Sequence, residues 1–164
     1  MKGTIYIDYE KCVACGRCEL ACAVEHSRSK EIVASMSEPM PPQPRIRIEA
    51  SNGFSTPLFC YHCENPQCIE VCPSGAISKL ETGQVILDEE LCVGCGACQF
   101  ACHLGVPERR RDGRAMIKCD LCMSRLELAM KPACVTACRT GSLTFEFDDK
   151  KTAKDAIIVY KKTG

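Results

Sequence analysis

The chain has 164 residues and a formal net charge of zero, which excludes the basic surplus typical of a nucleic-acid-binding domain. Its longest apolar stretches, such as residues 156–160, are about five residues long, whereas a helix needs about 20 to cross a bilayer, so no membrane span is expected. Sixteen cysteines and no tryptophan leave little apolar material for a core, so a disulfide or metal framework has to support the fold.

The first expected element is a strand over residues 4–7, which leads into the first group of cysteines. That group has the spacing C-x2-C-x2-C-x3-C. Three thiolates at this spacing can surround one compact object, whereas the fourth lies one helical turn further on and points away from it. Bacterial ferredoxins show this run, and their fourth cysteine binds the other cluster of a pair. The spacing therefore predicts one 4Fe–4S cluster on Cys12, Cys15 and Cys18, and a different cluster for Cys22.

A proline-rich connector over residues 36–44, with a bias to extended structure, separates the first group from the second. Residues 45–49 alternate in polarity and are expected to form a strand. The second group spans residues 60–72, and it widens the middle gap to four residues while keeping the C-x3-C ending. The shared ending is an internal repeat in ligand spacing.

Residues 76–78 and 84–87 are expected to form a β-hairpin, because both segments have strand character and Gly83 supplies a positive φ for the turn. The third group follows over residues 92–102 with the same spacing as the first group. Two cysteine groups joined by a hairpin have the size of one bacterial ferredoxin. The sequence therefore predicts an inner ferredoxin-like unit over residues 51–111.

An outer unit, made of residues 1–50 and 112–164, is expected to surround the inner one. Residues 115–118 are an expected strand entering the fourth group, whose middle gap is eleven residues. Residues 143–147 alternate after that group and repeat the pattern that follows Cys72. Strands 45–49 and 115–118 would be two halves of a hairpin opened by the inserted unit. The expected fold is α+β, with two nested 2x(4Fe–4S) ferredoxin-like units built from short hairpins and short helices.

Nesting predicts which cysteines share a cluster, because the last cysteine of one group is expected to complete the cluster of the other group in its unit. Four 4Fe–4S clusters are expected, each with three ligands from one group and one from another. The expected ligand sets are Cys12, Cys15, Cys18 and Cys138; Cys119, Cys122, Cys134 and Cys22; Cys60, Cys63, Cys68 and Cys102; and Cys92, Cys95, Cys98 and Cys72.

Other uses of cysteine fit the spacing less well. Cysteines three apart on a tight loop pair poorly as disulfides. A zinc-stapled structural adaptor is the main alternative, but zinc accounts neither for the third cysteine of the first group nor for the C-x3-C ending found four times. A catalyst that uses a cluster as a Lewis acid would need an open iron site, and so a missing cysteine, and no group lacks one.

The three histidines are not needed as ligands, since sixteen cysteines fill sixteen positions. His62 and His103 could hydrogen-bond a cluster sulfide, but we expect both to be loop side chains facing solvent. His26 is expected to cap a helix end. The basic stretch 108–114 is either a docking surface for an acidic partner or, as we expect, a solvated loop. Residues 151–162 are expected to form a final helix or strand lying on the protein or on a neighbour.

Four motifs give the chain a resemblance to a known family: residues 18–26 (CELACAVEH), 60–77 (ending CIEVCPSGAI), 83–102 (ending CVGCGACQFAC) and 118–122 (KCDLC). The chain resembles the four-cluster ferredoxin-type electron-transfer subunits of DMSO reductase, formate dehydrogenase, formate hydrogenlyase, hydrogenase, CO dehydrogenase and tungsten aldehyde oxidoreductase complexes. The resemblance implies the nested ligand sets given above. It also implies a subunit that is not an enzyme itself but passes single electrons between a catalytic subunit and a second partner.

Differences from the larger members narrow the choice of complex. Some members of the family lack one of the sixteen cysteines, and some have a C-terminal membrane helix or large insertions. None of these features is expected here. The small subunit of a tungsten aldehyde oxidoreductase is the first choice, with CO dehydrogenase, formate dehydrogenase and hydrogenase complexes as alternatives. The expected partners are a tungsten or molybdenum catalytic subunit, a second electron carrier or flavin subunit, and further stacked copies of the chain. A reducing cytoplasm is the expected compartment.

Overall fold

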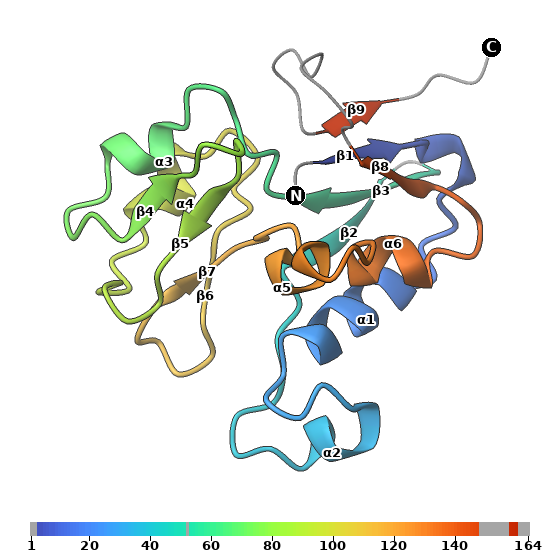
Figure 1. Cartoon of the computed structure of the whole chain (residues 1–164), viewed down its shortest axis with the longest axis horizontal. Coiled ribbons are helices and arrows are strands. Elements are labelled where there is room, and N and C mark those ends of the chain that lie inside the picture. Colours follow the sequence, from blue (N-terminus) through green and yellow to red (C-terminus); the bar gives the residue numbers. More distant parts are fainter. Residues whose placement is uncertain (1–2, 52, 148–157, 161–164) are drawn as a thin grey trace.

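The computed structural model describes residues 3–51, 53–147 and 158–160, which form short helices and short strands joined by loops (Figure 1). The strands are β1 (Gly3–Ile7), β2 (Ile46–Ser51), β3 (Phe54–Phe59), β4 (Ile77–Lys79), β5 (Val85–Leu87), β6 (Glu108–Arg109), β7 (Met116–Ile117), β8 (Leu143–Phe147) and β9 (Ile158–Tyr160). The α-helices are α1 (Arg17–Glu25), α2 (Ile32–Met36), α3 (Gln67–Glu70), α4 (Ala97–Ala101), α5 (Met123–Glu127) and α6 (Ala133–Ala137). This mixture of small helices and strands agrees with the expected α+β class.

The strands nearest the two chain ends form one sheet in the order β8–β1–β9. β1 runs antiparallel to β8, with Ile5 opposite Phe145 and Ile7 opposite Leu143, and all four side chains are buried because alternation places them on one face. β9 lies parallel to β1. The expected strands at both ends are confirmed. Residues 158–160 of the expected final element are a strand, and its remaining residues lie outside the described part of the chain.

The expected opened hairpin between strands 45–49 and 115–118 is wrong. β2 instead pairs antiparallel with β3, with Ile46 opposite Phe59, and β7 pairs with β6, with Ile117 opposite Glu108. Each strand closes a hairpin with its neighbour in sequence, because a short loop loses less conformational entropy on closure than a long one. The β2–β3 hairpin crosses the expected unit boundary between residues 50 and 51.

The central β-hairpin is confirmed. β4 pairs antiparallel with β5, with Ile77 opposite Leu87. Gly83 lies in the connecting turn with a φ of 91°, and its N–H donates to the carbonyl of Leu80 at 2.8 Å. Glycine adopts this conformation without a steric penalty, which is why the turn falls there.

The helices that carry cysteines pack in two pairs. α1 packs against α6, which also contacts β8, and α3 packs against α4 and contacts β4. Figure 1 shows the elements from the two chain ends, in blue and orange to red, set apart from the green and yellow elements of the middle. We call β1, β8, α1 and α6 the terminal region, and β4, β5, α3 and α4 the central region.

Buried cysteines form part of two apolar clusters in the described part of the chain. The larger cluster includes Ile5, Ile7, Ile46, Phe59, Leu126, Leu143 and Phe145 together with Cys18, Cys22, Cys60, Cys119 and Cys134. The smaller one contains Ile77, Val85, Met116 and Cys98, with Cys68, Cys72 and Cys92 packed against it. Because potential metal ligands occupy core positions, folding and metal binding are coupled in this chain.

Candidate iron–sulfur sites

The third cysteine of each group is the second residue of a short helix: Cys18 in α1, Cys68 in α3, Cys98 in α4 and Cys134 in α6. The residue before each helix separates the groups into two kinds. Gly16 and Gly96, with φ of 71° and 82°, precede α1 and α4, whereas Pro66 and Pro132 precede α3 and α6. Groups one and three therefore share one local structure, and groups two and four share another.

A positive φ recurs just before the second cysteine of every group. The residues are Ala14, His62, Gly94 and Leu121, with φ of 52°, 49°, 64° and 60°. In groups two, three and four this conformation directs the backbone N–H to the Sγ of the first cysteine, at 3.4 Å in each case. Hydrogen bonds to the sulfur stabilise its negative charge. Only group three has a glycine at this position, so Gly94 is the one residue from which the sequence could indicate the positive φ. In the structure, a Cβ at Gly94 would lie 2.8 Å from the backbone oxygen of Gly113.

None of the sixteen cysteines forms a disulfide. Burial raises the pKa of the Cys18 and Cys122 thiols to about 12, and it holds the pKa of Cys119 and Cys134 well above the usual range. The thiolate charge of Cys12 adds to the rise at Cys18. Buried thiolates grouped in this way repel one another and need a bound cation. Iron coordinated by thiolates supplies that charge, so this donor set fits iron–sulfur clusters.

Cys22 lies beside the cysteines of group four. Its charge adds to the rise in pKa that burial causes at Cys119, Cys122 and Cys134. Packing of α1 against α6 brings these segments together, although they are far apart in the sequence. The Sγ of Cys22 also accepts a hydrogen bond from the backbone N–H of Arg45 at 3.2 Å.

The central region repeats this exchange of cysteines. Burial raises the pKa of Cys63, and that of Cys68 to about 11, and in both cases the charge of Cys102 contributes. In the same way, the charge of Cys72 adds to the effect of burial on the pKa of Cys98. A cavity is lined jointly by Cys60, Cys63, Cys68 and Cys102. The cysteines of one expected ligand set therefore surround a single cavity.

The last cysteines of groups two and four have matching surroundings. A hydroxyl two residues further on lies near each sulfur, 3.8 Å for Ser74 and Cys72, and 3.6 Å for Thr140 and Cys138. The Sγ of Cys138 also accepts the N–H of Leu143 at 3.3 Å. Burial alone would raise the pKa of Cys72, but the hydrogen bond from Ser74 and neighbouring backbone N–H groups lower it overall. The similar sequences after these two cysteines thus produce similar sites.

His62 is not the solvent-facing loop residue that we expected. It is 3% exposed, and its Nδ1 accepts the backbone N–H of Val85 at 3.0 Å. Burial, and then the positive charge of Lys118, hold the pKa of His62 well below its usual range. His103 is exposed, as expected, and its ring packs edge-on against Tyr61. Both residues line the cavity of Cys60, Cys63, Cys68 and Cys102. The neighbouring β5 backbone, which the sequence around His62 does not reveal, explains the burial.

His26 is the C-cap residue of α1, as expected, and its Nδ1 lies 2.8 Å from the carbonyl oxygen of Cys22. Its Nε2 lies 3.1 Å from a carboxylate oxygen of Asp120. Burial alone would lower the pKa of His26, but the contacts with Asp120 and Cys22 raise it to about 10. The cap therefore also connects α1 to the fourth cysteine group.

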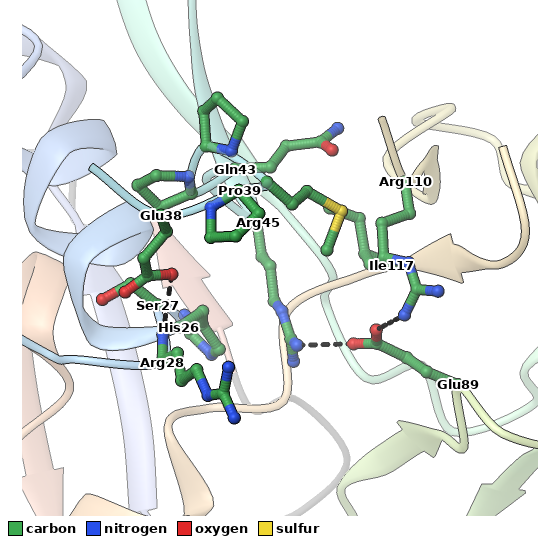
Figure 2. A pocket seen from close by; sticks show the side chains of 13 residues that line it. His26, Ser27, Arg28, Glu38, Pro39, Gln43, Arg45, Glu89, Arg110 and Ile117 are labelled. Atoms are coloured by element: carbon green, nitrogen blue, oxygen red, sulfur yellow. Dashed lines mark hydrogen bonds and ion pairs between the residues drawn. The ribbon is translucent and has the colours of Figure 1, made fainter. Parts of the chain in front are cut away.

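Arg45 connects the fourth cysteine group to the loop before the third. Its guanidinium lies 2.7 Å from Glu89, and Glu89 also pairs with Arg110 at 2.8 Å (Figure 2). The same guanidinium lies 3.2 Å from Asp120, between the first two cysteines of the fourth group. A cleft of about 420 Å³ adjoins these residues. Arg110 belongs to the basic stretch 108–114, so one arginine of that stretch is engaged in ion pairs with Glu89 and Asp112 and is not free for docking.

In the described part of the chain, we find no helix with the length and apolar character required to cross a membrane.

Comparison with known proteins identifies the class and then the family. Residues 5–22 match a 4Fe-4S binding domain, so the chain is a ferredoxin-type iron–sulfur protein. Residues 52–148, more than half of the chain, match the 4Fe-4S dicluster domain, and the chain belongs to that family. Its sixteen cysteines in four groups correspond to four 4Fe–4S clusters. Membership identifies an electron-transfer subunit rather than a catalytic one, which favours iron–sulfur clusters over structural zinc.

Several relatives match most of the chain. The B subunit of the anaerobic dimethyl sulfoxide reductase of Escherichia coli (strain K12) is 36% identical over 145 residues, covering 85% of this chain and 71% of the relative. The putative electron transport protein YsaA of the same strain is 38% identical over 146 residues, covering 87% of this chain and 88% of the relative. The iron-sulfur subunit of its nitrate-inducible formate dehydrogenase is 32% identical over 179 residues, covering 96% of this chain and 61% of the relative.

Among solved structures, the active site complex BamBC of benzoyl coenzyme A reductase, in complex with zinc, contains a polypeptide with a TM-score of 0.50 and 22% identity. The match covers 93% of this chain and 82% of that polypeptide. At this level of identity the likeness is one of fold.

Proposed function

We propose that this chain carries electrons, one at a time, between a catalytic oxidoreductase subunit and a second redox partner. The observation that carries the proposal is the same thiolate loop built four times, with a positive-φ residue before the second cysteine and a helix holding the third. Several equivalent sites in one small chain suit conduction along a row of clusters. A single catalytic centre would need only one such site.

The proposed ligand sets are the four given by nesting. Three of them have support from the positions of the exchanged cysteines, because Cys22 lies beside group four, Cys102 beside group two and Cys72 beside group three. For the fourth set, the charge of Cys12 acts on Cys18, and Cys138 ends the helix that packs against α1. The packing of α1 against α6 and of α3 against α4 supports an exchange of last cysteines between groups one and four, and between groups two and three.

Two nested ferredoxin-like units, expected over residues 1–50 with 112–164 and over residues 51–111, are proposed on the same grounds, with the first boundary moved to the end of β3. The pairing of β1 with β8 supports an outer unit that joins the chain ends, and the β4–β5 hairpin supports an inner one. β3 pairs with β2 and its Phe59 belongs to the larger core, so the passage from the outer to the inner unit falls after β3 rather than at residue 51.

When bound, each cluster supplies a one-electron couple. The chain's own residues provide the thiolate ligands and control the surroundings of the cluster. Backbone N–H groups such as those of His62, Gly94 and Leu121 donate to ligand sulfur, which favours the more negative state. Apolar side chains such as Val85 and Val106, both buried, keep water from the sulfur. No proton transfer or bond rearrangement is required of the protein.

We further propose that the catalytic partner is a tungsten or molybdenum oxidoreductase. The relatives named for dimethyl sulfoxide reductase and formate dehydrogenase support a partner of the oxidoreductase class. A tungsten aldehyde oxidoreductase remains our first choice, with CO dehydrogenase, formate dehydrogenase or hydrogenase as alternatives. A second carrier, a flavin subunit or stacked copies of the chain would receive the electrons, in the cytoplasm. Anaerobic purification of the native complex followed by mass spectrometry identifies the partner directly.

Metal and sulfide analysis of anaerobically purified protein tests the function. We expect about sixteen iron and about sixteen sulfide per chain, with spectra of interacting reduced clusters after dithionite treatment. About four zinc without sulfide would instead establish the structural adaptor and exclude electron transfer.

Replacement of single exchanged cysteines tests the ligand sets. In Cys22→Ser, we expect altered spectra for the cluster bound by Cys119, Cys122 and Cys134, because oxygen replaces one of its sulfur ligands. The matched variant Cys18→Ser should alter a different cluster, although both residues are in α1. Identical spectral changes in the two variants would contradict the exchange.

A further inference from the structure

Lys118 is a buried cation at the meeting point of two cysteine groups. It follows β7, directly precedes Cys119, and is only 3% exposed. Its Nζ donates to the carbonyl of Cys119 at 2.9 Å and to the carbonyl of Val85 in β5. The side chain therefore links the fourth cysteine group to the central hairpin. Two of the three ammonium hydrogens are used in these bonds.

The same side chain lines the cavity formed by Cys60, Cys63, Cys68 and Cys102. No Asp, Glu or Arg and no other Lys is among the described residues that line this cavity. Lys118 also has no carboxylate partner among the ion pairs of the described residues. A buried ammonium is costly without a nearby negative charge. Among the residues that line this cavity, the cysteine thiolates are the groups that can balance it, and the charge of Lys118 favours the thiolate of Cys68.

We propose that Lys118 raises the reduction potential of the cluster held by Cys60, Cys63, Cys68 and Cys102. This rests on the proposed electron-transfer function and ligand set. Reduction adds one electron, supplied by the donor, and changes no bond or proton. The added negative charge is stabilised by a fixed positive charge, and the interaction is strong because the dry interior screens it weakly. Lys118 therefore directs an electron that crosses between the groups toward this cluster.

Lys79 provides a matched control within the same chain. Its Nζ also donates to two backbone carbonyls beside this cluster, those of Cys63 at 3.2 Å and Glu64 at 2.7 Å. Unlike Lys118, Lys79 is exposed, so water and salt screen its charge. The two lysines thus carry the same charge near the same cysteines and differ mainly in burial.

The test compares Lys118→Met with Lys79→Met in anaerobic holoprotein whose iron and sulfide contents match the wild type. Potentiometric titration followed by EPR should show one midpoint lowered in Lys118→Met, with the equilibrium constant for reduction decreased at least tenfold, or about 59 mV for one electron. Lys79→Met should change it less than about threefold, and Lys118→Arg should retain most of the wild-type value. Cys63→Ser assigns the signal, because it alters the spectrum of the same cluster.

Unchanged midpoints in Lys118→Met, or an equal shift in Lys79→Met, would overturn the proposal. Lys118→Gln provides a second neutral variant in case Met disturbs the fold. If both neutral variants assemble fewer clusters while Lys118→Arg assembles all of them, Lys118 acts in assembly, and the proposal for the potential is wrong. Failure of the electron-transfer function itself is distinguished beforehand, because the wild-type protein would then contain zinc and no sulfide.

Discussion

The terminal and central regions hold the same kind of cysteine loop on very different amounts of apolar core. In the terminal region, Ile5 and Phe145 belong to a large buried cluster around β1 and β8. Among the described residues, the smaller cluster of the central region has three buried apolar side chains beside Cys98, those of Ile77, Val85 and Met116, with Ile69 and Leu87 partly buried against it. Its helix α3 has four residues, against nine in α1. The difference teaches that apolar side chains support the loops of the terminal region, whereas the loops of the central region depend more on the metal centres themselves.

Removal of the iron–sulfur clusters should produce the largest difference in stability between the two regions. After chelation of iron, we expect the amides of β4 and β5 to exchange with deuterium at least about tenfold faster than those of β1 and β8. The central strands lose the thiolate–iron bonds that replace a core, whereas the terminal sheet keeps its buried isoleucines. Hydrogen exchange with mass spectrometry measures this, with the holoprotein as control. Equal loss of protection in both regions would contradict the comparison.

Two isoleucine variants sharpen the comparison in the holoprotein. Ile5→Ala should decrease the free energy of unfolding by about 4 kcal/mol and Ile77→Ala by about 2 kcal/mol, because the cost grows with the cavity volume that remains, and the smaller cluster collapses more readily around a truncated side chain. Both side chains are buried, at 0% and 4% exposed. Leu20→Ala, at a site 53% exposed, should cost less than about 0.5 kcal/mol. Anaerobic urea unfolding provides the values, and a larger loss for Ile77→Ala would reverse the interpretation.

Glycine variants test whether the contact between Gly94 and Gly113 constrains the cysteine loop of group three. Gly94→Ala should destabilise the protein by about 2 kcal/mol, since a Cβ would lie 2.8 Å from the oxygen of Gly113 in addition to the cost of positive φ. Gly75→Ala, where no atom lies within 4 Å of the added Cβ, should cost only about 1 kcal/mol. Ala14 already occupies the position equivalent to Gly94 in group one. Urea midpoints that are equal for the two variants would show that the contact with Gly113 relaxes freely.

The smallest expected effect concerns an ion pair between α1 and α5. Glu25 in α1 contacts Arg125 in α5 at 2.9 Å and Lys30 at 3.1 Å. Burial alone would raise the pKa of Glu25, but Lys30 and Arg125 lower it overall. A lowered folded-state pKa stabilises the protein above the unfolded-state value, near 4.5, and this contribution is lost as the pH falls through the folded-state value.

We therefore expect Glu25→Gln to cost about 1 kcal/mol at pH 7, and the difference from wild type to decrease below about pH 4.5. Unfolding of both proteins at each pH measures the difference, since acid effects on the clusters are common to both. Glu127→Gln is a suitable control, because Glu127 is exposed on α5 and makes no ion pair with a described residue. A difference that grows with acidity would contradict the assignment.

Sequence reasoning succeeded where the signal is local. The alternation in residues 4–7 and 143–147 predicts β1 and β8, and Gly83 marks the turn of the central hairpin, because strand period and turn conformation depend on adjacent residues. It failed for the partners of β2 and β7, since the alternating pattern of a strand does not identify the strand beside it. It failed for His62 because a neighbouring strand buries that side chain.

The sequence by itself determined the four cysteine groups that fit four 4Fe–4S clusters, since cysteine spacing within one or two turns decides which thiolates can face the same object. It also determined the central hairpin and the family. Only the tertiary structure decided that Cys22 lies beside group four, that Arg45 connects two cysteine groups, and that Lys118 lines a cavity together with cysteines to which it is not adjacent in sequence. Those contacts depend on how α1 packs against α6 and how β7 meets β5. Packing between distant segments is a property of the whole chain, which no local pattern records.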